Sequence, residues 1–274
     1  MRLGDNRCKG QVDEQGRQRS ELEAFLSEVE SKAKPVIEKL RGGHSLDDGE
    51  RMDLASFIAL GSGRTPDMVE SVQAMNGQLV KRLGRAMFSD ERSVLDTLMR
   101  DEDKVGRSRD ELLEEARRVV QFIQSDAYEV NTDQQWALQM AVSTSAELAP
   151  ILAERDWFVL HRDNPKKSFV TCDAPVALTR AGRVAQGMYR GVGFATPDAL
   201  MVFPLTQSCV LAMQDFGGSL QHATIDTAKV RDTNLLMASR CQRFLIGRDS
   251  KLVESLAGEV QLGTSAWKPR MSIH

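Results

Sequence analysis

The sequence predicts an α+β protein in which an N-terminal helical array packs on a C-terminal, mostly antiparallel sheet. Apolar residues recur at spacings of three and four from about residue 20 to residue 152, which is typical of amphipathic helices. From residue 155 onward, short runs of β-branched and aromatic residues are separated by turn residues, which is typical of strands. Each predicted helix has one apolar stripe, so the helices must bury it against one another or against the sheet.

Local signals set the limits of the first two helices. The first is expected from about Ser20 to Leu40, with Pro35 kinking or splitting it and Gly42-Gly43 ending it. Ser45 opens an S-x-x-D pattern, a variant of the capping box, ahead of the second helix. That helix is expected to stop at the Gly-Ser-Gly of residues 61–63.

The later helices carry start signals of the same kind. Thr65 is suited to cap the third helix and Pro66 to occupy its first position. A short helix is expected over residues 90–99. Ser108-x-x-Glu111 and Thr132-x-x-Gln135 are capping boxes that open two more helices.

The strand half begins at Trp157–Leu178, which is predicted to form a β-hairpin and then a sharp corner. Its strands are expected over residues 156–162 and 167–172, joined by an Asp-Asn-Pro-Lys turn, with the corner at Asp173-Ala174-Pro175. Both faces of the first strand are apolar, so we expect it to be covered on both sides. The later elements expected are a hairpin of residues 199–205 and 208–213, a helix over 227–241, a strand over 243–247 and a helix over 250–256.

We expect three regions along the chain. Residues 1–19 form a disordered tail, residues 20–154 a helical region, and residues 155–274 a β-rich region with a late helix. The helical and β-rich regions are expected to make one compact domain. The Gly-rich, basic residues 180–198 are expected to form a long loop of the kind that is usually functional or mobile.

Composition excludes several classes of protein. The chain has 274 residues, a net charge of −3 and four cysteines without a CxxC pair, so neither a zinc ribbon nor a global attraction to nucleic acid is supported. No apolar leader and no apolar run of roughly 18 residues appears, so we expect a cytoplasmic protein without membrane association. Walker A, GxSxG and HExxH motifs are absent. We therefore expect no cofactor.

Several segments together resemble a bacterial domain of unknown function, family 4238. They are Glu30, FIALGSGRTP (57–66), SFVTCDAPVAL (168–178), VFPLT (202–206) and Asn234. The resemblance covers roughly residues 20–250 and implies a helical region followed by a β-rich region. We expect Thr65, Pro66, Pro175 and Asn234 to have structural roles. The chain departs from the family pattern at Ala174, where members carry Asn, and lacks a segment like HYVPQFYLRRF ahead of the first helix.

Three residues are candidates for catalysis: Asp173, His161 and Asp163. Two carboxylates near a histidine can hold a divalent metal or activate a water molecule. Under the structural interpretation, the Asp173 carboxylate instead accepts backbone N–H bonds at the corner, and His161 is a packed core histidine. Both interpretations stay open from the sequence alone.

Four basic residues are candidates for anion binding: Arg64, Lys166, Lys167 and Arg183. Arg64 precedes a predicted helix N-terminus, where backbone N–H groups favour anions. The structural alternatives are an ion pair between Arg64 and an acidic side chain that docks the helix onto the sheet, and a solvated charged loop for the others.

Two functional hypotheses follow. The preferred one is a non-catalytic interaction or regulatory protein with a protein partner, nucleic acid staying open as a partner. The alternative is a metal-dependent hydrolase or nuclease, in a phage-defence or mobile-element setting, that uses Asp173 with Asp163, His161 or Arg64 and a divalent metal.

Overall fold

The computed structural model describes residues 11–12, 18–19, 21–101, 106–180 and 192–260. Among these residues, those up to residue 66 and from residue 141 onward form one compact unit, and those between residues 67 and 140 form the other. The helical segments precede the main sheet along the chain, and the sheet is mostly antiparallel, so the predicted α+β class is confirmed. The predicted disordered tail lies mostly outside the described residues, and within it β1 (Gln11–Val12) pairs with β2 (Gln18–Arg19).

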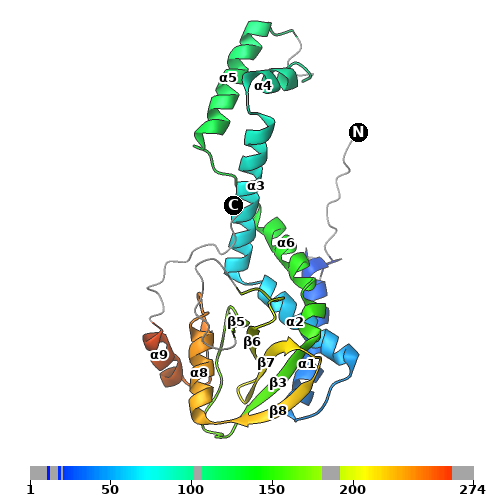
Figure 1. Cartoon of the computed structure of the whole chain (residues 1–274), viewed down its shortest axis with the longest axis vertical. Coiled ribbons are helices and arrows are strands. Elements are labelled where there is room, and N and C mark those ends of the chain that lie inside the picture. Colours follow the sequence, from blue (N-terminus) through cyan, green and yellow to red (C-terminus); the bar gives the residue numbers. More distant parts are fainter. Residues whose placement is uncertain (1–10, 13–17, 20, 102–105, 181–191, 261–274) are drawn as a thin grey trace. The chain divides into compact units, whose positions relative to one another are not determined.

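The first unit places a five-stranded sheet between two layers of helices (Figure 1). The strand order is β5-β6-β7-β3-β8. The strands are β3 (Arg155–Arg162), β5 (Ala177–Arg180), β6 (Ala199–Pro204), β7 (Cys209–Phe216) and β8 (Leu220–Ile225). One face packs on α1 (Glu21–Arg41), α2 (Asp48–Gly63) and α7 (Ala149–Ala153), and the other on α8 (Thr227–Ala238) and α9 (Ser250–Glu259).

Alternation along the strands produces these two faces. In β6, Met201 and Phe203 belong to the core cluster on the α1–α2 side, whereas Val202 belongs to the cluster on the α8–α9 side. In β3, Trp157 and Val159 point to the first cluster and Leu160 packs on the second. The expectation that this strand is covered on both sides is therefore confirmed.

The predicted hairpin at Trp157–Leu178 is wrong. Strand β3 does not pair with the residues that follow it; it pairs antiparallel with β7 and parallel with β8. Residues 171–172 form β4 (Thr171–Cys172), which pairs with β9 (Leu245–Ile246) in a separate two-stranded sheet. The Asp-Asn-Pro turn chemistry is present, but it leads away from the sheet because Asn234 of α8 binds the backbone at Ser168 and Val170.

Sequence analysis missed β8. The turn at Gly217-Gly218 joins β7 to β8, which would ordinarily pair as a hairpin. Here β3 lies between them, and the turn crosses the start of β3, where both glycine N–H groups donate to Glu154 O at 3.2 and 3.0 Å. Asp156 accepts a bond from Ser219 N at 2.9 Å at the same crossing.

A buried arginine holds this crossing together. Arg51 of α2 is 9 % exposed, and its guanidinium lies 4.3 Å from the ring centroid of the fully buried Trp157. It donates to Ala153 O at 2.6 Å, to Ser219 O at 3.3 Å and also to Arg155 O. Burial lowers the pKa of the Arg51 guanidinium, but an arginine stays charged at neutral pH.

The helix limits follow the predicted signals with three corrections. Helix α1 is continuous through Pro35, because buried Val36 and Leu40 continue its core-facing stripe beyond the proline. The capping box of α2 is formed by Asp47 and Glu50 rather than by Ser45, because Asp47 adopts the extended cap conformation. At α6 (Gln134–Ala146) the cap is Asp133, which accepts from Trp136 N at 2.8 Å, and not Thr132.

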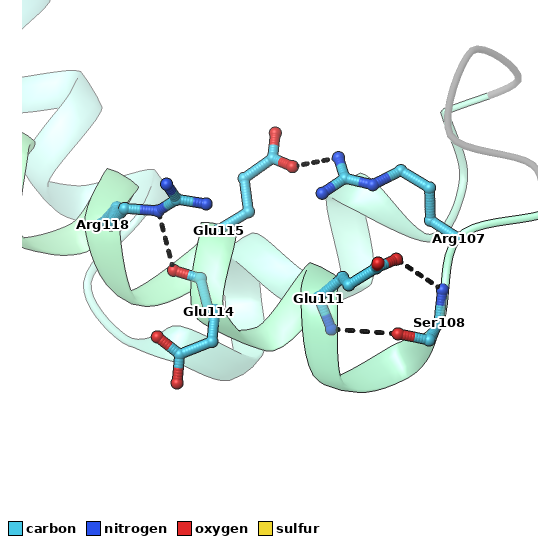
Figure 2. Close-up of polar contacts among 6 residues, drawn as sticks. All are labelled: Arg107, Ser108, Glu111, Glu114, Glu115 and Arg118. Carbon is cyan, nitrogen blue, oxygen red and sulfur yellow. Dashed lines mark hydrogen bonds and ion pairs between the residues drawn. The ribbon is translucent and has the colours of Figure 1, made fainter.

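The second unit contains α3 (Pro66–Met87), α4 (Glu91–Leu98) and α5 (Arg109–Ser125). Helices α4 and α5 share a small core of Val94, Leu95, Leu112, Ala116 and Val120. Figure 2 shows the predicted capping box at the start of α5: Ser108 Oγ accepts from Glu111 N at 3.3 Å, and Glu111 accepts from Ser108 N at 3.0 Å. Pro66 occupies the first position of α3, as predicted.

We predict that Arg51→Met lowers the free energy of unfolding by about 3 kcal/mol, because three carbonyls and the Trp157 face lose their cationic partner. Chemical denaturation measures this. The matched control is Arg41→Met, which removes an exposed pair with Glu38 and should cost less than about 1 kcal/mol. Equal losses in the two variants would contradict the role given to Arg51.

The glycines of the FIALGSGRTP segment supply a second matched pair. A Cβ at Gly63 would lie 2.3 Å from Ser145 Oγ and 2.8 Å from Ala141 O, whereas at Gly61 the nearest atom is 3.8 Å away. We expect Gly63→Ala to destabilise by more than about 1 kcal/mol through overpacking. Gly61→Ala should be neutral or stabilise by up to about 1 kcal/mol through helix propensity. Thermal unfolding of both variants tests this, and a harmless Gly63→Ala would contradict it.

Candidate functional site: a basic pocket beside the Asp173 corner

The corner at Asp173 is held by a segment about 70 residues further along the chain. Its carboxylate accepts from Gln242 N at 3.0 Å and from Arg243 N at 2.9 Å, and its own N–H donates to Phe244 O at 3.1 Å. The β4–β9 ladder continues directly from this clamp. The structural interpretation predicted that backbone N–H groups of the corner itself would donate to the carboxylate. The donors come instead from the segment between α8 and β9.

Asn234 makes an equivalent link on the other side. Its side chain is 2 % exposed, donates to Ser168 O at 2.8 Å and accepts from Val170 N at 3.0 Å. The buried amide therefore pairs with one backbone C=O and one backbone N–H of the same segment, as a neighbouring strand would in a sheet. It fixes residues 168–170 on α8, so the structural role expected for Asn234 has a physical basis.

The turn before Ser168 presents two lysines. Asn164 accepts from Lys166 N at 2.9 Å with its side chain and from Lys167 N at 3.0 Å with its carbonyl. Arg162 donates to Lys167 O. The backbone of the turn is therefore internally bonded, and both lysine side chains are exposed.

A pocket of about 490 Å³ lies between this turn, α8 and the start of α9. Four cationic side chains and one carboxylate line it, a local charge of +3 in a chain of net charge −3. The charged residues are Lys166, Lys167, Arg231, Arg248 and Asp249. Val230 and Leu252 supply apolar surface, and Asn234 and Ser168 supply polar groups.

The cations of the pocket are largely unneutralised. Arg231 pairs with Glu259, and Asp249 caps α9 by accepting from Lys251 N at 2.9 Å. Within the described part of the chain, Lys166, Lys167 and Arg248 have no ion-pair partner. Converging cations of this kind attract anions, and phosphate oxygens in particular.

The comparisons with known proteins identify the family. A family model described as protein of unknown function (DUF4238) matches residues 6–251. This chain belongs to the DUF4238 family. Neither the search of curated proteins nor the search of solved structures found a match.

The DUF4238 chain brings only some of the predicted site residues together. Lys166 and Lys167 lie in the pocket. Arg64 forms an ion pair with Glu30 at 3.1 Å, which joins the end of α2 to α1 and not a helix to the sheet. Arg183 lies outside the described residues. Arg231 and Arg248 were not singled out, since only the Asn234 and Asp173 links bring their segments to Lys166.

The three candidate catalytic residues are not bonded to one another. Neither a hydrogen bond nor an ion pair joins His161, Asp163 and Asp173 in the described part of the chain. Asp163 lies in the exposed turn after β3. Over the described residues, no group of three or more His, Cys, Asp or Glu side chains is placed to hold a metal ion. Burial raises the pKa of the Cys172 thiol to about 12, so this neighbour of Asp173 stays protonated at neutral pH.

His161 instead belongs to a chain of hydrogen bonds that sequence analysis missed. Its Nε2 lies 3.1 Å from His222 Nδ1 of β8, and His222 Nε2 lies 3.2 Å from His44 O. Because the carbonyl can only accept, a neutral His222 carries its proton on Nε2 and accepts at Nδ1 from His161.

Among the residues that the structure describes, no helix is long and apolar enough to cross a membrane.

Burial, and secondarily the His222 ring, lower the pKa of His161 in the folded DUF4238 protein. The unfolded chain therefore binds more protons than the folded one as pH falls below about 6.5, so stability falls and then levels off below the folded pKa. In His161→Gln, we expect the free energy of unfolding to fall less as the pH is lowered. Urea denaturation at pH 7.5, 6.5, 5.5 and 5 measures this. An unchanged pH profile in the variant would contradict the prediction.

Proposed function

We propose that this DUF4238 chain is a non-catalytic binding protein whose ligand is a small phosphate-bearing anion held in the basic pocket. The observation that carries the proposal is the convergence of Lys166, Lys167 and Arg248, without ion-pair partners in the described part of the chain, on a pocket of about 490 Å³. Small-molecule sites usually occupy roughly 300–1,000 Å³.

The chemistry of the lining favours binding. Lysine and arginine groups provide charge and N–H donors that fit phosphate oxygens. Apolar surface from Val230 and Leu252 can cover an uncharged part of the ligand. The one carboxylate of the lining, Asp249, is engaged as the cap of α9, which supports a binding role over a general base.

The proposal includes a cytoplasmic location. Cys172, Cys209 and Cys241 are free thiols in the described part of the chain. Thiols of this kind persist in reducing compartments. The cytoplasm also contains phosphorylated small molecules, so the proposed location is consistent with the proposed ligand.

Isothermal titration with sodium pyrophosphate and with sodium phosphate at low ionic strength tests the proposal. We expect saturable binding of pyrophosphate that weakens as salt is added. Lys166→Ala, Lys167→Ala and Arg248→Ala should each lower the affinity by about tenfold, since each removes one charge-assisted contact. The matched control Lys34→Ala removes an exposed lysine on α1 and should leave the affinity unchanged.

Two outcomes would overturn the proposal. One is a wild-type protein that binds neither anion, and the other is equal affinity in the pocket variants and in Lys34→Ala. Release of phosphate from p-nitrophenyl phosphate, or cleavage of plasmid DNA, that needs Mg²⁺ and disappears in Asp173→Asn would favour the metal-dependent hydrolase instead.

A further inference from the structure

Two polar side chains hold the segments that form the walls of the basic pocket: Asn234, which lines the pocket, and Asp173, which does not. Asn234 fixes residues 168–170, which follow directly after Lys166 and Lys167. Asp173 fixes the backbone at Gln242 and Arg243, and the chain then runs through β9 to Arg248. One wall carries the lysines and the other carries Arg248.

The path from Asp173 to Arg248 is short and constrained. Three hydrogen bonds hold residues 242–244 to Asp173, and Leu245 and Ile246 are paired with Cys172 and Thr171. At Gly247 an added Cβ would lie 2.8 Å from Val253 Cγ2 and 3.1 Å from Val170 Cγ1, so the backbone passes close to its neighbours there. Arg248 is the next residue, and Asp249 then caps α9.

We propose that Asp173 is a positioning residue of the pocket: by clamping the N–H groups of Gln242 and Arg243, it sets the place of Arg248 and thereby the affinity for the anionic ligand. This inference rests on the proposed function. It gives Asp173 a role through Arg248, without contact to the ligand. The carboxylate is needed because it presents an acceptor oxygen to each of two N–H groups.

Asp173→Asn tests the clamp with almost no change of shape. Asparagine keeps one acceptor oxygen and turns an NH₂ group toward the second N–H, so one bond becomes a donor–donor contact. We expect pyrophosphate affinity to fall about tenfold, to the level of Arg248→Ala. Asp47→Asn is the matched control, because Asp47 also accepts a backbone N–H but lies in the α1–α2 layer on the opposite face of the sheet.

Double-mutant cycles separate positioning from general loosening of the fold. If Asp173 acts through Arg248, Asp173→Asn has no further effect in an Arg248→Ala background. In a Lys166→Ala background, on the other wall, it should keep its full effect. Effects that multiply with both partners would overturn the inference, as would an Asp173→Asn variant with wild-type affinity.

Hydrogen exchange in the wild-type chain provides a readout that does not depend on a variant folding. Because the ligand binds more tightly when Arg248 is held in place, pyrophosphate should slow exchange of the Gln242 and Arg243 amides. The Glu50 amide, which Asp47 caps, should exchange at an unchanged rate. Binding of pyrophosphate without protection at residues 242 and 243 overturns the inference and leaves the proposed function intact. Absence of binding of both pyrophosphate and phosphate refutes the proposed function itself.

Discussion

The first unit depends on one buried contact, the Arg51 guanidinium on the face of Trp157. Strand β3 lies between β7 and β8, and the turn that joins them must cross its start. Arg51 reaches this crossing from α2 and bonds to carbonyls of Ala153, Arg155 and Ser219. An apolar side chain could fill the space but could not satisfy these carbonyls, because buried acceptors need donors. The contact thus ties α2 to the end of α7, the start of β3 and the turn that leads into β8.

The opposite face is organised by two polar side chains of the segments that resemble the family. Asn234 binds the chain at Ser168 and Val170, and Asp173 binds it at Gln242 and Arg243. Both provide side-chain bonds to backbone groups of irregular segments, at Ser168 and Val170 for Asn234 and at Gln242 and Arg243 for Asp173. The basic pocket lies where these two irregular segments meet the N-terminal parts of α8 and α9. Asn234 and Asp173 therefore have a structural role, and the segments that they hold form the proposed binding pocket.

Predictions based on neighbouring residues were mostly accurate, and the two predicted hairpins had different outcomes: β6 pairs with β7 as expected, whereas the hairpin at Trp157–Leu178 is wrong. The Ser108–Glu111 box and the start of α3 at Pro66 were confirmed because a cap involves residues within one turn. The hairpin at Trp157–Leu178 failed, although its strand and its turn both exist, because the choice of partner is made by β7 and β8 from about 50 residues away. For the candidate site, Lys166 and Lys167 were found from local charge, whereas Arg231 and Arg248 were not, since nothing near them in sequence marks the pocket.

The sequence by itself determined the α+β class, most helix limits, the two-sided burial of β3 and the family resemblance, because all four depend on periodicity or on short motifs. Only the tertiary structure decided that β3 separates β7 from β8, that Asp173 clamps the segment before β9, and that four cationic side chains surround one pocket. These outcomes depend on contacts between segments far apart in the chain, which are selected by the packing of the whole unit. The role of Trp157–Leu178 accordingly changes from a self-contained hairpin to the place where the sheet, α8 and the pocket are joined.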